Sequence, residues 1–146
     1  MRILAVDNGE RRVGLAVSDA SGTVAQPLSV EVLGRDDDVA DVVADAARRL
    51  GAEAVVIGLP RHMNGEEGEG AERARALAGI LRERLGVPVD LWDERLTTVM
   101  AHRVLREGGV SGRRRRQIVD KTAAALILQG FLDSRRGAAG SNRFAP

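Results

Sequence analysis

The chain has 146 residues, a formal net charge of +1 and no cysteine. It is therefore long enough for one domain, and it excludes two-lobed architectures, disulfide scaffolds, zinc ribbons and thiol catalysis. The balanced charge hides an asymmetry, because residues 95–146 carry eleven basic and three acidic side chains, whereas residues 1–94 carry eleven and eighteen; the basic part predicts a face for an anionic partner.

Three strands are predicted at the start of the chain. Residues 2–6 form a short apolar run that stops at a turn signal, the DNG sequence at 7–9, which is typical of a buried strand. Residues 13–18 and 24–33 are predicted as the second and third strands. Because the connections between them are short, the three strands predict an antiparallel meander.

Helices and strands then alternate. The apolar spacing predicts helices over 39–50, 72–85, 98–107 and 114–132, and strands over 54–57 and 87–92. Strands joined through helices should be parallel with right-handed crossovers. The predicted fold is therefore α/β, in the order β-β-β-α-β-α-β-α-α, with a mixed five-stranded sheet covered by helices. We expect one domain over residues 1–136, a C-terminal tail over 137–146, and a cytoplasmic protein without a signal peptide or membrane contact.

Three acidic residues are candidates for chemistry. Asp7 ends a buried strand, Glu94 follows the last strand, and Asp120 lies close to the apolar stripe of the final helix. Sites in open α/β sheets lie at the carboxyl ends of the parallel strands, where these three carboxylates could converge. Oxygen ligands of this kind suit Mg²⁺ or Mn²⁺, and two ions about 4 Å apart can activate a water for phosphodiester cleavage. In the alternative interpretation, each acid caps a helix or pairs with an arginine.

Whether Asp93 contributes to the site stays open. Adjacent residues of a strand point to opposite faces, so Asp93 and Glu94 cannot easily serve one site together.

Arginines are the candidates for binding nucleic acid, since their planar fork suits phosphate. Four of them open the final helix, where each positive charge is unfavourable by roughly 0.3–1 kcal/mol; they either form a solvated run or contact a polyanion. The loop over residues 58–70 is expected at the edge of the substrate groove. The candidates for substrate contact are Arg11, Arg12, His62, Arg95, Arg113, Arg114, Arg115 and Arg116. For Arg11, Arg12 and Arg95, phosphate binding and fixing of nearby acids both stay open.

Several motifs together resemble those of one family. They are VDNGERRVGLA at 6–16, VIGLP at 56–60, HMNG at 62–65, DERLTT at 93–98 and DKTAAALILQ at 120–129. Over about residues 1–135 the chain resembles the YqgF family of bacterial RNase H-like nucleases, which are also described as Holliday junction resolvases. The resemblance implies an RNase H-like fold, divalent-metal-dependent cleavage of nucleic acid, and trimming of the 5′ end of precursor 16S rRNA.

By position, the resemblance assigns the catalytic and metal-binding roles to Asp7, Glu94 and Asp120. The chain departs from the family pattern at Asn8 and Glu10, where the family commonly has an aromatic residue and a threonine. Glu10 adds an acid near the predicted site, either pointing outward or helping to hold a metal.

The main functional hypothesis is a nuclease that uses Mg²⁺ or Mn²⁺ on structured RNA, with ribosomal precursor particles as a partner. The alternatives are a Holliday junction resolvase acting on branched DNA, and a nucleic-acid-binding or assembly factor without turnover. An actin-like ATPase would need a second lobe, which the length excludes. The choice between RNA and DNA, and the oligomeric state, stay open.

Overall fold

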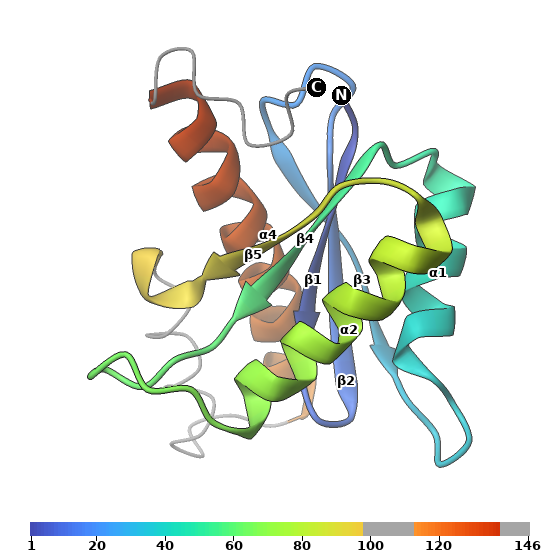
Figure 1. Cartoon of the computed structure of the whole chain (residues 1–146), viewed down its shortest axis with the longest axis vertical. Helices are drawn as coiled ribbons and strands as arrows, with labels where there is room; N and C mark the ends of the chain where they lie inside the picture. Colours follow the sequence, from blue (N-terminus) through green and yellow to red (C-terminus); the bar gives the residue numbers. More distant parts are fainter. Residues whose placement is uncertain (98–112, 138–146) are drawn as a thin grey trace.

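The computed structural model describes residues 1–97 and 113–137, and the side chains of residues 1–97 and 123–136. Five strands form one sheet with helices on both faces (Figure 1). The elements are β1 (Ile3–Asn8), β2 (Arg12–Ser18), β3 (Ala25–Val32), α1 (Val39–Leu50), β4 (Ala54–Leu59), α2 (Glu69–Leu85), β5 (Val89–Asp93), the 3₁₀ helix η1 (Glu94–Leu96) and α4 (Arg113–Gly137). The helix predicted over 98–107, the connection after it and the tail after residue 137 lie outside the described residues.

The sheet has the strand order β3-β2-β1-β4-β5. β1 pairs antiparallel with β2, and β2 antiparallel with β3, whereas β1 with β4 and β4 with β5 are parallel. The predicted meander and the mixed five-stranded sheet are therefore confirmed. In the described part of the chain, no helix is long and apolar enough to cross a bilayer.

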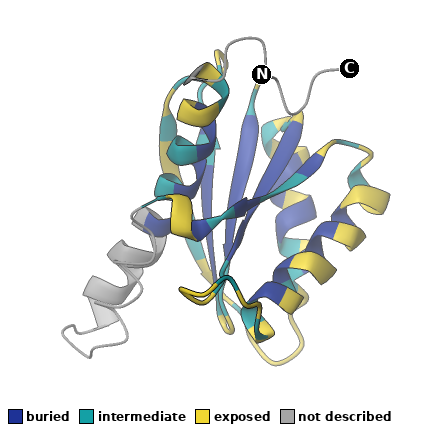
Figure 2. Cartoon of the chain, turned by 60° about the vertical axis from the view of Figure 1, so that its left-hand side comes forward, coloured by how far each residue is buried: buried dark blue, intermediate teal, exposed yellow. Residues whose placement is uncertain are grey.

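Alternation along the strands divides the core into two clusters, one on each face of the sheet. Figure 2 shows the buried strands of the sheet with helices on both sides. Leu4 and Val6 belong to the cluster packed under α1 and α2, whereas Ile3 and Ala5 belong to the cluster under α4. Because successive side chains of a strand point to opposite faces, Asp7 belongs to the α4 face. Every residue of β4 is buried, as expected for a continuous apolar strand covered on both sides.

The predicted limits of the first helix are confirmed. Asp38 caps α1 by accepting a hydrogen bond from the Ala40 amide at 2.9 Å, and Gly51 ends it in the left-handed conformation with φ +63°.

The second helix begins earlier than predicted. α2 begins at Glu69 rather than at residue 72. A Cβ at Gly70 would lie 2.8 Å from Cγ of Pro60, so this glycine permits close packing inside the first turn and does not mark a loop. β5 also differs, because it begins at Val89 and includes Asp93.

Candidate active site

Two of the predicted acids lie buried at one end of the sheet. Asp7 is the fifth residue of β1 and is 3% exposed, and Glu94 begins η1 directly after β5 and is 1% exposed. Asp7 follows the apolar residues 3–6 and Glu94 follows Asp93, so the fold places a buried carboxylate near the end of each strand. These ends are the carboxyl ends of parallel strands, where α/β proteins place their sites.

Gly58 lies between these two acids. The parallel register pairs Val6 with Ile57, so that Asp7 and Gly58 are the next residues along their strands. A Cβ at Gly58 would lie only 2.6 Å from Oε1 of Glu94 and 2.6 Å from Cδ1 of Ile127. The Glu94 carboxylate therefore occupies the space that a side chain at position 58 would fill. Asp7 on β1, Gly58 on β4 and Glu94 directly after β5 thus lie at the same end of the sheet, on the face covered by α4.

The backbone of α4 places the third acid on the same side. Asp120 precedes Ile127 by seven residues, about two helical turns, so both positions share one face of the helix. Ile127 is buried against the sheet and reaches Gly58, and α4 begins at the end of the sheet where β1 and β4 finish (Figure 1). The side chain of Asp120 lies outside the described residues, so its predicted role stays a prediction.

The donor chemistry of the two described acids fits a hard divalent cation. Carboxylate oxygens are the ligands that Mg²⁺ and Mn²⁺ favour, and buried charges in proteins are paired or coordinate metals. Among the residues whose side chains are described, no three His, Cys, Asp or Glu side chains form a group that could hold a metal ion. A complete ligand set therefore needs a further group, and Asp120 is the predicted one.

Asp93 points away from this acid pair. By alternation it belongs with Leu91 and Val89 on the α1 and α2 side, whereas Trp92 packs under α4. Its carboxylate accepts hydrogen bonds from the backbone amide of Arg95 at 2.9 Å and from the guanidinium of Arg95 at 2.7–3.1 Å. The hydrogen bonds from Arg95 hold the pKa of Asp93 below its usual value. Asp93 is therefore engaged by arginine on the opposite face from Glu94.

The predicted substrate-binding residues are distributed around this end of the molecule. Arg11 is exposed in the turn after β1, Arg12 is half-buried at the start of β2, and His62 is exposed in the loop after β4. Arg95 is bound to Asp93. The four arginines at 113–116 open α4 as its first residues, and their side chains lie outside the described residues.

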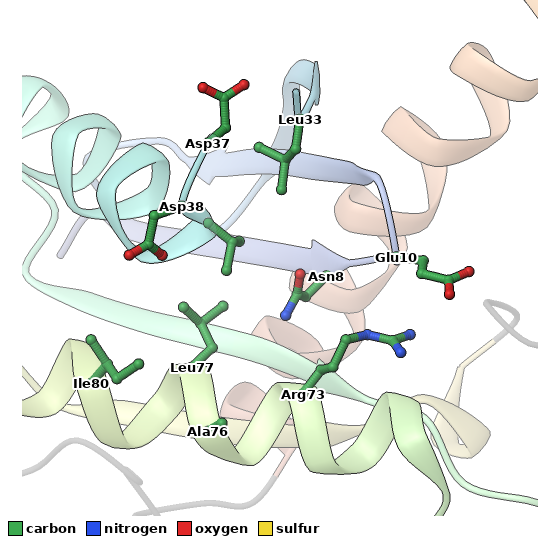
Figure 3. A pocket seen from close by; sticks show the side chains of 11 residues that line it. Asn8, Glu10, Leu33, Asp37, Asp38, Arg73, Ala76, Leu77 and Ile80 are labelled. Carbon is green, nitrogen blue, oxygen red and sulfur yellow. The ribbon is translucent and has the colours of Figure 1, made fainter. Parts of the chain in front are cut away.

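A pocket of about 400 Å³ lies at the same end of the sheet on the other face (Figure 3). Asn8 and Arg73 line it together with apolar side chains such as Leu77, and neither Asp7 nor Glu94 belongs to its lining. Glu10 is exposed, and its carboxylate points away from the pocket. Whether Glu10 points outward or helps to hold a metal stays open, because Asp7 and Glu94 do not line this pocket.

Two functional candidates were missed by sequence reasoning. Gly58 lies in the VIGLP motif, but only the Glu94 contact shows why a side chain is excluded there. Arg61 follows that motif closely and bridges Glu67 at 3.1 Å and Asp93 at 3.7 Å. For Gly58, the available signal was a glycine that interrupts an apolar strand. Arg61 had no such signal, because its partners come from separate elements.

The mixed sheet and the helices on its two faces define an RNase H-like fold. Solved structures with this fold include T. thermophilus RuvC in complex with Holliday junction substrate, at 20% identity and TM-score 0.60 over 94% of this chain and 97% of that one. The fowlpox virus Holliday junction resolvase matches at 14% identity and TM-score 0.53 over 92% and 99%. The expected fold class is confirmed.

The chain belongs to the RuvX family, described as Holliday junction resolvase, whose family model matches residues 1–134. A relative from Pelotomaculum thermopropionicum named "Putative pre-16S rRNA nuclease" is 48% identical over 151 residues, covering 100% of this chain and 98% of that protein. A relative of the same name from Moorella thermoacetica is 49% identical over 135 residues, covering 91% and 95%. The resemblance to the YqgF family is confirmed, and the chain is a member of a nuclease family.

Proposed function

We propose that this protein is a metal-dependent nuclease that hydrolyses phosphodiester bonds at the 5′ end of precursor 16S rRNA. The observation that carries the proposal is the convergence of Asp7 and Glu94 beside Gly58, at the carboxyl ends of three neighbouring strands. The choice of RNA follows the names of relatives that are 48% and 49% identical.

Asp7, Glu94 and Asp120 would hold one or two Mg²⁺ or Mn²⁺ ions. When bound, such ions supply Lewis-acid activation of a water and charge stabilisation at the leaving oxygen. Burial of Asp7 and Glu94 fixes the direction of their oxygens, because neither side chain can rotate freely in a packed core. Gly58 provides the space in which the Glu94 carboxylate lies. Arginines at the rim would bind the phosphates on either side of the scissile bond.

The direct test is cleavage by purified wild-type protein, Asp7→Asn and Glu94→Gln, with Mg²⁺ and with Mn²⁺. A labelled fragment spanning the mature 5′ end of 16S rRNA and a four-way DNA junction are incubated side by side. We expect new RNA 5′ ends only with wild-type protein and metal. Full metal-dependent cleavage by Asp7→Asn would overturn the site assignment.

The family description favours a second candidate, a Holliday junction resolvase acting on branched DNA. The same acids would serve both reactions, so only the substrate differs. Faster cleavage of the junction than of the RNA in the paired assay would select this candidate.

A nucleic-acid-binding factor without turnover is the remaining alternative. Its binding would weaken with salt in the same way as that of a nuclease, but it would make no new ends with either metal. The paired assay therefore separates all three functions.

A further inference from the structure

A chain of ion pairs connects the loop after β4 with the end of β5. Arg75 forms a two-pronged contact with Glu67, with both nitrogen–oxygen distances at 2.7 Å. Arg61 then bridges Glu67 at 3.1 Å and Asp93 at 3.7 Å, and Asp93 binds Arg95 at 2.7 Å. We call these five residues the rim network. It joins the loop after β4 and the first turns of α2 to the end of β5, which comes later in the sequence.

Asp93 aligns two arginines within the rim network. A single oxygen, Oδ2, lies 2.7 Å from NH2 of Arg95 and 3.7 Å from NH1 of Arg61. Two guanidinium groups therefore share one carboxylate oxygen. Repulsion between two like charges so close is offset by the anion between them. The Asp93 carboxylate thus holds the guanidinium groups of Arg61 and Arg95 near each other.

The rim network keeps the capacity to bind a further anion. Three guanidinium groups face two carboxylates, which leaves one net positive charge. The side chains of Arg61 and Arg95 are 29% and 30% exposed, so solvent reaches part of each. Within the described residues, the buried Nε of Arg61 has no hydrogen-bond partner. A guanidinium has five donors, and the acceptors around Arg61 leave some of them unused.

The arginine pair lies at the same end of the sheet as the acids, after the carboxyl ends of β4 and β5. Arg95 directly follows Glu94, and Arg61 lies three residues after Gly58. The loop between Arg61 and Glu67 is compact, since the His62 amide donates to the Glu66 carbonyl at 2.9 Å and the Gly65 amide to the His62 carbonyl at 2.8 Å. A Cβ at Gly65 would lie 3.4 Å from NH1 of Arg95, so this loop packs against Arg95. The pair is thus held by this loop beyond the carboxyl ends of β4 and β5.

We propose that Arg61 and Arg95, aligned by Asp93, form a subsite for a backbone phosphate of the nucleic acid, next to the phosphate that is cleaved. Asp93 is a positioning residue that acts through the two arginines and holds no metal. The position of the subsite beside the cleaved phosphate rests on the proposed nuclease function. The phosphate subsite itself requires only that the protein binds nucleic acid.

The test is the salt dependence of binding, measured without divalent metal so that no cleavage occurs. Fluorescence anisotropy gives the affinity for the labelled rRNA fragment and the four-way junction over a range of salt concentrations. The slope of log affinity against log salt is negative, and loss of one phosphate contact reduces its magnitude by about 0.7–0.9. We expect this change, with affinity reduced about tenfold, in Arg61→Ala and in Arg95→Ala.

Arg49→Ala is the matched control, because Arg49 is an exposed arginine paired with Asp45 on α1 and contributes to no candidate site. We expect it to keep the wild-type slope. Arg61→Lys serves as the second variant in case Arg61→Ala unfolds, and it should keep the slope while losing affinity, since it keeps the charge but not the fork. Wild-type slopes in folded Arg61→Ala and Arg95→Ala would overturn the subsite.

Asp93→Asn tests the positioning role in the cleavage assay. We expect a raised KM, an unchanged kcat, and an unchanged Mg²⁺ concentration for half-maximal rate. Glu94→Gln should instead lose kcat. A raised metal requirement in Asp93→Asn would overturn the positioning role. The two proposals fail separately: wild-type protein that binds with arginine-dependent slopes but never cleaves refutes the nuclease and keeps the subsite.

Discussion

Replacing Gly58 with alanine tests whether Glu94 lies where the structure puts it. The added Cβ would lie 2.6 Å from Oε1 of Glu94 and 2.6 Å from Cδ1 of Ile127. Both separations are well inside the 3.5–4.0 Å at which heavy atoms attract one another. Because β4 is buried along its whole length, the strand cannot move away from α4, and the carboxylate or the helix has to shift.

The expected destabilisation follows from this crowding. Inserting a methyl group into a well-packed core costs about 1–3 kcal/mol of unfolding free energy. Rotation of the Glu94 side chain would relieve the clash and reduce the loss of unfolding free energy. The same rotation would move the carboxylate away from the end of the sheet where Asp7 lies. Gly58→Ala therefore loses stability, cleavage activity or both, and the loss of activity should be the larger effect where Glu94 moves.

Urea unfolding and metal-dependent cleavage measure the two effects. Gly79→Ala is the matched control, since Gly79 lies inside α2 with nothing within 4 Å of an added Cβ. The control should gain about 0.8–1 kcal/mol from helix propensity and keep full activity. Wild-type stability together with wild-type cleavage in Gly58→Ala would show that Glu94 does not lie over this glycine.

Three further predictions concern the stability of the fold. Removing the helix cap in Asp38→Ala should lower the unfolding free energy by about 1 kcal/mol in urea titrations. Gly86→Ala should cost about 1–2 kcal/mol in the same titrations, because φ is +66° and no neighbour compensates the strain; an unchanged midpoint would contradict the left-handed cap. A hydrogen bond from Ser21 and those from the amides of the Asp19 loop lower the pKa of Asp19 from 3.8 to about 2. This carboxylate therefore stabilises the fold above pH 3.8 and loses the effect as the pH falls through 2, so the Tm difference between wild type and Asp19→Asn should vanish below that pH.

Local patterns in the sequence were sufficient to predict the sheet and to select Asp7 and Glu94 as candidates. Alternating turn signals and apolar runs predicted the meander, and the apolar continuity of residues 54–57 predicted a doubly covered strand. Asp7 and Glu94 were identifiable because a carboxylate at the end of a buried strand is unusual. Alternation along a strand also favoured opposite faces for Asp93 and Glu94, although the sequence left the role of Asp93 open.

The remaining features depend on contacts between distant elements. Gly70 was predicted as part of a loop, but its role is set by Pro60, ten residues earlier in the chain. Arg61 could not be singled out from the sequence, because its partners Glu67 and Asp93 become neighbours only when β4, α2 and β5 assemble. Spacing rules describe faces of single elements, whereas ion pairs across elements need the tertiary fold.

The most direct test of the proposed nuclease is the rate at which new 5′ ends form from the precursor 16S rRNA fragment with Mg²⁺ present. Wild-type protein and Glu94→Gln are compared at equal concentration, after circular dichroism has shown that both are folded. We predict cleavage by the wild type at the mature 5′ end and a loss of rate of at least about 100-fold in the variant, as is typical when a group that stabilises the transition state is removed. Equal rates for the two proteins would contradict the assignment of Glu94 and, with it, the proposed site.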